Sequence, residues 1–86
     1  GNVTEIKPNA FTNRHYGSIN LNEDLQVIDS YAFNHVKIDW IRFPENLKEI
    51  KPYAFHNTNL RAVYVPEGIQ VDTNAFDSYT NVITVK

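Results

Sequence analysis

The chain has 86 residues, enough for one small domain with a limited hydrophobic core. Its composition, with 42% hydrophobic, 13% aromatic and 21% charged residues, is that of an ordered globular protein, and its net charge of −2 gives no indication of electrostatic nucleic-acid binding. It has no cysteine for a disulfide, a thiolate metal site or a thiol nucleophile, no apolar run long enough to cross a membrane, and no signal peptide.

In chain order, the sequence consists of four similar units. Three of them align without a gap, Val3 to Asp24, Leu25 to Asn46 and Leu47 to Gly68, and a fourth, Ile69 to Lys86, follows with small adjustments. The period is about 22 residues, in the range of solenoid repeats. One such unit cannot bury its own apolar face, whereas units stacked in line form a continuous core. The period therefore predicts a single domain, residues 1–86, with about four coils (3–24, 25–46, 47–68 and 69–86), as part of a longer surface protein.

The same apolar positions recur in every unit. An Ala-Phe pair is found at Ala10-Phe11, Ala32-Phe33, Ala54-Phe55 and Ala75-Phe76. A β-branched residue precedes each pair, at Ile6, Ile28, Ile50 and Val71. Equivalent side chains stack on one another in neighbouring coils, so we expect the four phenylalanines to pack in one row, each burying about 150–250 Å².

The end of each unit predicts a short β-strand. Ile38 to Phe43 and Leu60 to Val65 are rich in β-forming residues, and apolar and polar residues alternate at their ends. Pro44 and Pro66 stop these strands, because proline cannot donate a hydrogen bond to a strand ladder. Equivalent strands of successive coils run parallel about 4.8 Å apart, which predicts a parallel sheet on one face.

The start of each unit predicts a helical turn. Pro8 and Pro52 stand just before an Asn-Ala-Phe or Tyr-Ala-Phe segment, and proline suits the first position of such a turn. Ser30 and Thr73 occupy the same column and can cap it. The predicted fold class is an α/β repeat solenoid. Short parallel β-strands form one sheet face, and helical or 3-10 turns with short extended segments form the opposite face.

The repeated columns resemble the BspA-like (treponemal-type) leucine-rich repeats of bacterial surface proteins. A unit of that family has roughly the form Leu-x-x-Ile-x-x-x-Ala-Phe, a short turn, then Leu-x-x-Val-x-Ile-Pro. The second and third units match it at Leu25, Ile28, Ala32, Phe33, Ile38, Ile41, Phe43 and Pro44, and at Leu47, Ile50, Ala54, Phe55, Leu60, Val63, Val65 and Pro66. The resemblance covers essentially the whole chain. It implies an extracellular or cell-surface location and binding of proteins or host ligands, and it implies no cofactor and no reaction.

The two end units depart from the family pattern. The first has Tyr16 where the family has leucine and Asn22 where it has proline. The last has one residue fewer before Ala75-Phe76 and, by alignment, one more after it, which places Tyr79 where many members have a cysteine. Such departures are typical of terminal repeats, and they leave the strand register of the last coil open.

The family's strand points its named residues inward and the x residues to the sheet surface. Three outward columns follow: Gly17, Asp39, Arg61 and Ile83; Ser18, Trp40, Ala62 and Thr84; Asn20, Arg42, Tyr64 and Lys86. We expect Asp39 and Arg61 to lie opposite each other on adjacent strands. Tryptophan, tyrosine and arginine are enriched at interaction hot spots. The predicted ligand-binding residues of the sheet face are therefore Asp39, Trp40, Arg42, Arg61 and Tyr64. The alternative is that Trp40 packs on Arg42 or a neighbouring loop, since scattered surface aromatics are common.

Histidine and glutamate columns do not predict a metal site. His15, His35 and His56 occupy three different columns after the Ala-Phe pair, so polar loop positions explain them better than a shared ligand set. Glu23, Glu45 and Glu67 share a column with one carboxylate per coil, whereas a calcium ion takes about six to eight oxygen ligands. A solvated edge explains this column better.

The sequence also gives no basis for an enzyme. Ser18, Ser30 and Ser78 lack a Gly-x-Ser-x-Gly context, and three glycines do not make a phosphate-binding loop. We therefore expect no catalytic residues and no cofactor. The Asn2-Val3-Thr4 segment fits a glycosylation sequon, but this means nothing in a bacterial protein.

These observations predict an extracellular recognition or adhesion module that binds a protein or a glycan, including one of host origin, through its sheet face. They predict no nucleic-acid partner and no insertion into a membrane. The alternative is a structural spacer in a larger bacterial surface protein, with no ligand of its own. A binding module should expose a contiguous aromatic and basic patch, whereas a spacer should expose a bland polar face. The β-prone segment Val82 to Val85 would, if unpaired, allow edge-to-edge self-association.

Overall fold

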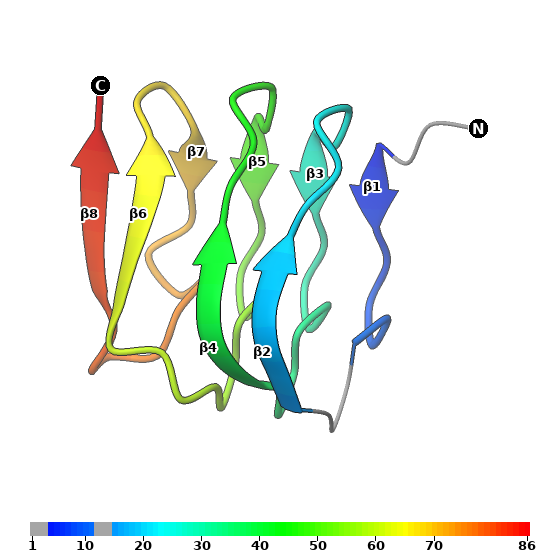
Figure 1. Ribbon diagram of the computed structural model, residues 1–86, viewed down its shortest axis with the longest axis vertical. Helices are drawn as coiled ribbons and strands as arrows, with labels where there is room; N and C mark the ends of the chain where they lie inside the picture. Colours follow the sequence, from blue (N-terminus) through cyan, green and yellow to red (C-terminus); the bar gives the residue numbers. More distant parts are fainter. Residues whose placement is uncertain (1–3, 12–14) are drawn as a thin grey trace.

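The computed structural model describes residues 4–11 and 15–86 and contains eight short β-strands. They are β1 (Glu5–Ile6), β2 (His15–Asn20), β3 (Val27–Ile28), β4 (Lys37–Arg42), β5 (Glu49–Ile50), β6 (Ala62–Pro66), β7 (Gln70–Val71) and β8 (Asn81–Val85). The odd-numbered strands form one parallel sheet in the order β1-β3-β5-β7, and the even-numbered strands form two parallel pairs, β2-β4 and β6-β8, on the other side (Figure 1). The chain is thus a parallel β-solenoid of about four turns.

The phenylalanines of the four Ala-Phe pairs form the expected row in the core. Phe11 and Phe33 have ring centroids 4.9 Å apart, Phe33 and Phe55 4.6 Å, and Phe55 and Phe76 4.8 Å, with all three ring pairs within 12° of parallel. The preceding alanine is fully buried in the last three coils. An alanine at this position lets successive coils approach closely enough for the rings to stack. The predicted row of phenylalanines is confirmed.

The face opposite the long strands carries no helix in the described residues, so the prediction of helical or 3-10 turns is wrong. The residues just before the first three alanines, Asn9, Tyr31 and Tyr53, have φ values of 62°, 60° and 63°, in the left-handed region. The Ala10 N–H donates to the Lys7 carbonyl at 3.2 Å, which places Pro8 at the second position of a β-turn and the positive φ at the third. This is the pattern of a type II turn.

The backbone hydrogen bonds of this corner explain why it is not helical. The Tyr31 N–H donates to the carbonyl of Tyr53 at 3.1 Å, and the Phe33 N–H donates to the carbonyl of Ala54 at 2.8 Å. These groups bond between coils, whereas an α-helix directs its N–H groups to carbonyls four residues earlier in the same segment. Proline suits the start of a type II turn as well as the start of a helix. The sequence pattern therefore did not distinguish the two.

The pairing of β2 with β4 agrees with the expected columns, whereas the pairing of β6 with β8 departs from them. Ser18 lies opposite Trp40, and Asn20 lies opposite Arg42. In the last coil, however, Tyr64 lies opposite Ile83. The expected columns of Arg61 with Ile83, of Ala62 with Thr84 and of Tyr64 with Lys86 are therefore wrong.

The length of the last loop causes this difference in register. The strand residues Ala62 and Asn81 are paired, and so are the core residues Phe55 and Phe76. Phe55 and Ala62 are seven positions apart, whereas Phe76 and Asn81 are five apart. The last loop is thus two residues shorter than the one before it, where the alignment predicted one residue more.

The face made by the long strands is divided in the middle. Within residues 4–11 and 15–86, no strand ladder joins β4 to β6, although β3 and β5 behind them remain paired. β4 begins at Lys37, whose equivalent in the next unit is Asn59, but β6 begins only at Ala62. The Asn59 side-chain oxygen accepts a hydrogen bond from the Ile38 N–H at 2.6 Å. A side-chain hydrogen bond therefore joins these two coils at the position where a backbone ladder between β4 and β6 was expected.

Candidate functional site

The side chains of β4 and β6 take the inward and outward positions expected of them. Ile38 and Ile41 are buried, at 1% and 7% exposure. Their neighbour Trp40 is 51% exposed, and Tyr64 on β6 is 58% exposed. The predicted outward display of these two rings is confirmed.

A groove with a cavity volume of about 520 Å³ lies between β4 and β6, where the ladder is missing. Trp40 and Arg42 of β4 line it together with Tyr64 and Pro66 of β6, and Val85 of β8 contributes at its end. The buried side chains Ile41 and Phe43 also line the groove. A paired sheet would close over such residues, so the break between the strands gives the groove its apolar floor.

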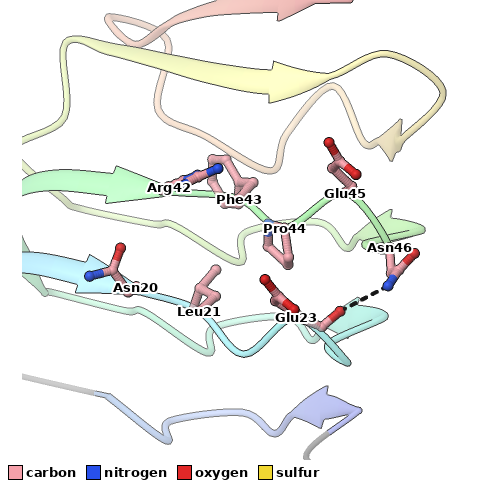
Figure 2. Close-up of a pocket in the computed structure, with 8 residues that line it drawn as sticks. All are labelled: Asn20, Leu21, Glu23, Arg42, Phe43, Pro44, Glu45 and Asn46. Carbon is pink, nitrogen blue, oxygen red and sulfur yellow. Dashed lines mark hydrogen bonds between the residues drawn. The ribbon is translucent and has the colours of Figure 1, made fainter.

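A second hollow of about 400 Å³ lies at the carboxyl ends of β2 and β4 and in the loops that follow them (Figure 2). Its polar lining includes Asn20, Glu23, Arg42 and Glu45. The Asn46 side-chain N–H donates to the Glu23 carbonyl oxygen at 3.2 Å and so joins the loops of two successive coils. Arg42, Phe43 and Glu45 line both the hollow and the groove, so the two are neighbours on either side of the end of β4.

Only three of the five predicted ligand-binding residues share the groove. Trp40, Arg42 and Tyr64 line it, whereas Asp39 and Arg61 lie outside it. Among the described residues, Asp39 lies 3.4 Å from the His15 Nε2, and the Arg61 guanidinium lies 5.0 Å from the centre of the Tyr79 ring. The expected opposition of Asp39 and Arg61 is therefore wrong. β4, which carries Asp39, does not pair with β6, which begins just after Arg61, and the short last loop places Tyr79 beside Arg61.

The groove also contains residues that the sequence analysis did not propose as ligand contacts. Pro66, Glu67 and Val85 line it, as does Glu45 in the loop after β4. The repeated Pro44-Glu45 and Pro66-Glu67 pairs could have indicated these contacts. Both pairs lie at or just after the ends of the strands that carry Trp40 and Tyr64. The sequence pattern predicts these prolines only as strand stops. In fact β4 ends at Arg42, before Pro44, whereas Pro66 is the last residue of β6.

The stacking geometry and the recurring columns agree with a comparison against protein families. The family model described as "BspA type Leucine rich repeat region (6 copies)" matches residues 2–86, nearly the entire chain. The chain belongs to the BspA-type leucine-rich repeat family. Repeats of this type form a module of bacterial surface proteins, and leucine-rich repeats are a non-catalytic protein-interaction fold. No curated protein and no solved structure matches the chain.

The last coil of this BspA-type chain is closed by a side-chain network. The Asp77 carboxylate accepts hydrogen bonds from the backbone N–H groups of Asn57 at 3.0 Å and Thr58 at 3.1 Å. The Tyr79 hydroxyl lies 2.9 Å from the Asp77 carboxylate and also contacts the Thr58 carbonyl, so its single proton is shared between these two acceptors. Burial, and then Asp77, raise the pKa of Tyr79 above its usual value of 10.0. This network compensates for the shortened loop and is structural.

The histidines of the BspA-type coils fall in two places. The rings of His35 and His56 are 6.3 Å apart beside the stacked pair Tyr31 and Tyr53, whereas His15 lies on β2 next to Asp39. No group of three or more His, Cys, Asp or Glu side chains that could hold a metal ion occurs in the described ranges. Those ranges also contain no helix long and apolar enough to cross a membrane.

Proposed function

We propose that the chain is a recognition module of the bacterial cell surface, acting in adhesion, whose long-strand face binds an extracellular protein or glycan of host origin. The observation that carries this proposal is the groove between β4 and β6, in which Trp40, Arg42 and Tyr64 lie together. Side chains of these three types contribute most to binding energy at protein interfaces.

The exposure of the rings supports the proposal. Trp40 and Tyr64 leave more than half of their surfaces open to water, at 51% and 58%, although a ring buries a large apolar area when it is covered. Their groove has an apolar floor at Ile41 and Phe43. A ligand that covers the rings and excludes water from this floor would gain stabilisation from a region already ordered by the solenoid.

The alternative function is that of a spacer with no ligand of its own. A spacer is expected to have a polar strand face, because exposed aromatic rings give it no advantage. The grouping of Trp40, Arg42 and Tyr64 in one groove favours recognition over this alternative.

The experiment is a binding screen of the soluble domain against immobilised host matrix proteins and glycans. The affinity for any ligand found is then compared between the wild type and the double variant Trp40→Ala/Tyr64→Ala. We expect a loss of at least about tenfold in affinity. The matched control is Tyr53→Ala, which removes an exposed ring at a distant corner and should leave binding unchanged. An affinity unaffected by the double substitution would contradict the proposal.

The cell-surface part of the proposal has a separate test. Antibodies raised against the domain should label intact cells of the producing bacterium. Labelling that requires permeabilised cells would overturn the proposed location.

A further inference from the structure

The polar hollow and the aromatic groove lie next to each other, on either side of the carboxyl end of β4. Both include Arg42, Phe43 and Glu45, so a chain-like ligand that crosses the end of β4 would contact the groove and the hollow at once. The exposed rings of Trp40 and Tyr64 line the groove, whereas the hollow is lined by the hydrogen-bonding side chains drawn in Figure 2.

The hollow offers both hydrogen-bond donors and acceptors. The Arg42 guanidinium only donates, the carboxylates of Glu23 and Glu45 only accept when ionised, and the Asn20 amide does both. A sugar hydroxyl is a donor and an acceptor at once, and neighbouring hydroxyls on a ring present both roles within a few ångströms. The mixed lining matches that chemistry.

The groove offers two exposed aromatic faces for an apolar contact. The face of an aromatic ring carries partial negative charge, which attracts the partially positive C–H groups on the flat side of a sugar ring. Trp40 and Tyr64 come from different strands and line the same groove, so successive sugars of one chain could each cover a ring.

The charges argue against a strongly charged ligand. Arg42 and Lys86 are balanced along the groove by Glu45 and Glu67. A site for a polyanion would present a field of one sign.

We infer that the ligand of this surface is a neutral oligosaccharide chain, whose sugar rings cover Trp40 and Tyr64 while its hydroxyls bond to Asn20, Glu23, Arg42 and Glu45. This inference rests on the proposed recognition function and names its ligand class.

The test uses an array of neutral oligosaccharides built from glucose, mannose, galactose and N-acetylglucosamine, with acidic oligosaccharides and peptides as the other arms. We expect the domain to bind at least one neutral chain and to show a change in the fluorescence of Trp40, its single tryptophan. Trp40→Ala and Asn20→Ala should each weaken that binding by at least about tenfold, whereas Trp40→Phe should restore most of it. Binding of a neutral chain should change by less than about twofold between low and high salt.

Arg42→Ala should also weaken binding of the neutral chain, and Arg61→Ala is its control, because Arg61 is exposed but lies outside the groove. If neutral oligosaccharides fail to bind while a protein or peptide binds in a manner that needs Trp40 and Tyr64, the oligosaccharide inference is overturned and the recognition function stands. If no ligand of any class depends on these two rings, the oligosaccharide inference and the proposed recognition function are both contradicted. Since both rings are exposed, circular dichroism should show that the variants remain folded.

Discussion

The side-chain oxygen of Asn59 accepts a 2.6 Å hydrogen bond from the backbone N–H of Ile38, and this bond links the third coil to the second at the start of β4. Elsewhere on this face, backbone ladders link β2 to β4 and β6 to β8. The groove of Trp40 and Tyr64 opens where the ladder is missing. An amide side chain therefore satisfies a strand N–H without requiring the two strands to pair.

Replacing Asn59 with alanine should destabilise the fold. The Ile38 N–H would lose its acceptor in a partly buried position, which costs about 1–3 kcal/mol in the free energy of unfolding. Urea titration measures this change. The matched control is Asn46→Ala, where an exposed amide is lost and the expected change is within about 0.5 kcal/mol. Equal stability of the two variants would show that the Asn59 bond is not needed.

Truncating the row of phenylalanines should be more costly. Phe33 is fully buried between Phe11 and Phe55, so Phe33→Ala should lower the free energy of unfolding by about 3–5 kcal/mol. The same measurement on Tyr64→Ala should give a change within about 0.5 kcal/mol, because that ring is exposed. A loss below about 1 kcal/mol for Phe33→Ala would mean that the coils do not depend on the row.

Acid should weaken the fold through Asp29. A side-chain hydrogen bond with Glu5, and then Lys51 at 3.3 Å, hold the pKa of this carboxyl below its usual value of 3.8, although desolvation opposes the shift. A lowered folded-state pKa contributes stability that is present above the unfolded-state pKa and is lost as pH falls through the folded-state pKa. Urea unfolding from about pH 7 to pH 2 should therefore show a smaller acid loss for Asp29→Asn than for the wild type. Identical profiles would contradict this assignment.

Alkali should weaken the fold through Tyr79. Burial and the hydrogen bond to Asp77 raise the pKa of this hydroxyl above 10.0. For a raised folded-state pKa, the stabilisation is complete below the unfolded-state value and is lost as pH rises through the folded-state value. The stability of the wild type should thus fall more steeply above pH 10.0 than that of Tyr79→Phe, which cannot ionise. A steeper decline in the variant would contradict the prediction.

Much of the solenoid could be predicted because its stacking depends on apolar side chains that recur at a fixed spacing. Phe33 and Phe55, for example, stack because they occupy the same column. The corner at Tyr31 could not be predicted in the same way. A non-glycine residue with positive φ is uncommon, and here the hydrogen bond from its N–H to Tyr53 in the next coil favours it. That bond forms between coils, and the local pattern around Pro8 or Ser30 does not reveal it.

Only part of the candidate site could be predicted, because the rest also depends on contacts between coils. Trp40, Arg42 and Tyr64 follow from the inward and outward pattern of one strand. The positions of Asp39 and Arg61 depend instead on how two strands pair, which is decided by Asn59 and by the short loop before Asn81. The Asn59 side chain changes no apolar column, and the short last loop shifts the register of β8 without altering the Ala-Phe columns. The alignment therefore had no means of detecting the break between β4 and β6.

The break also has a mechanical consequence. β3 and β5 remain hydrogen-bonded behind it, while β4 and β6 in front are not held by a ladder. The two halves of the solenoid are therefore joined by a ladder at the back and, at the front, by the Asn59 side chain in place of a ladder, so we expect the angle between them to change more easily than the angle between coils whose long strands are paired. A ligand bound in the groove would fix that angle and would therefore change the curvature of the solenoid. Binding at Trp40 and Tyr64 would then change the direction in which the last two coils point.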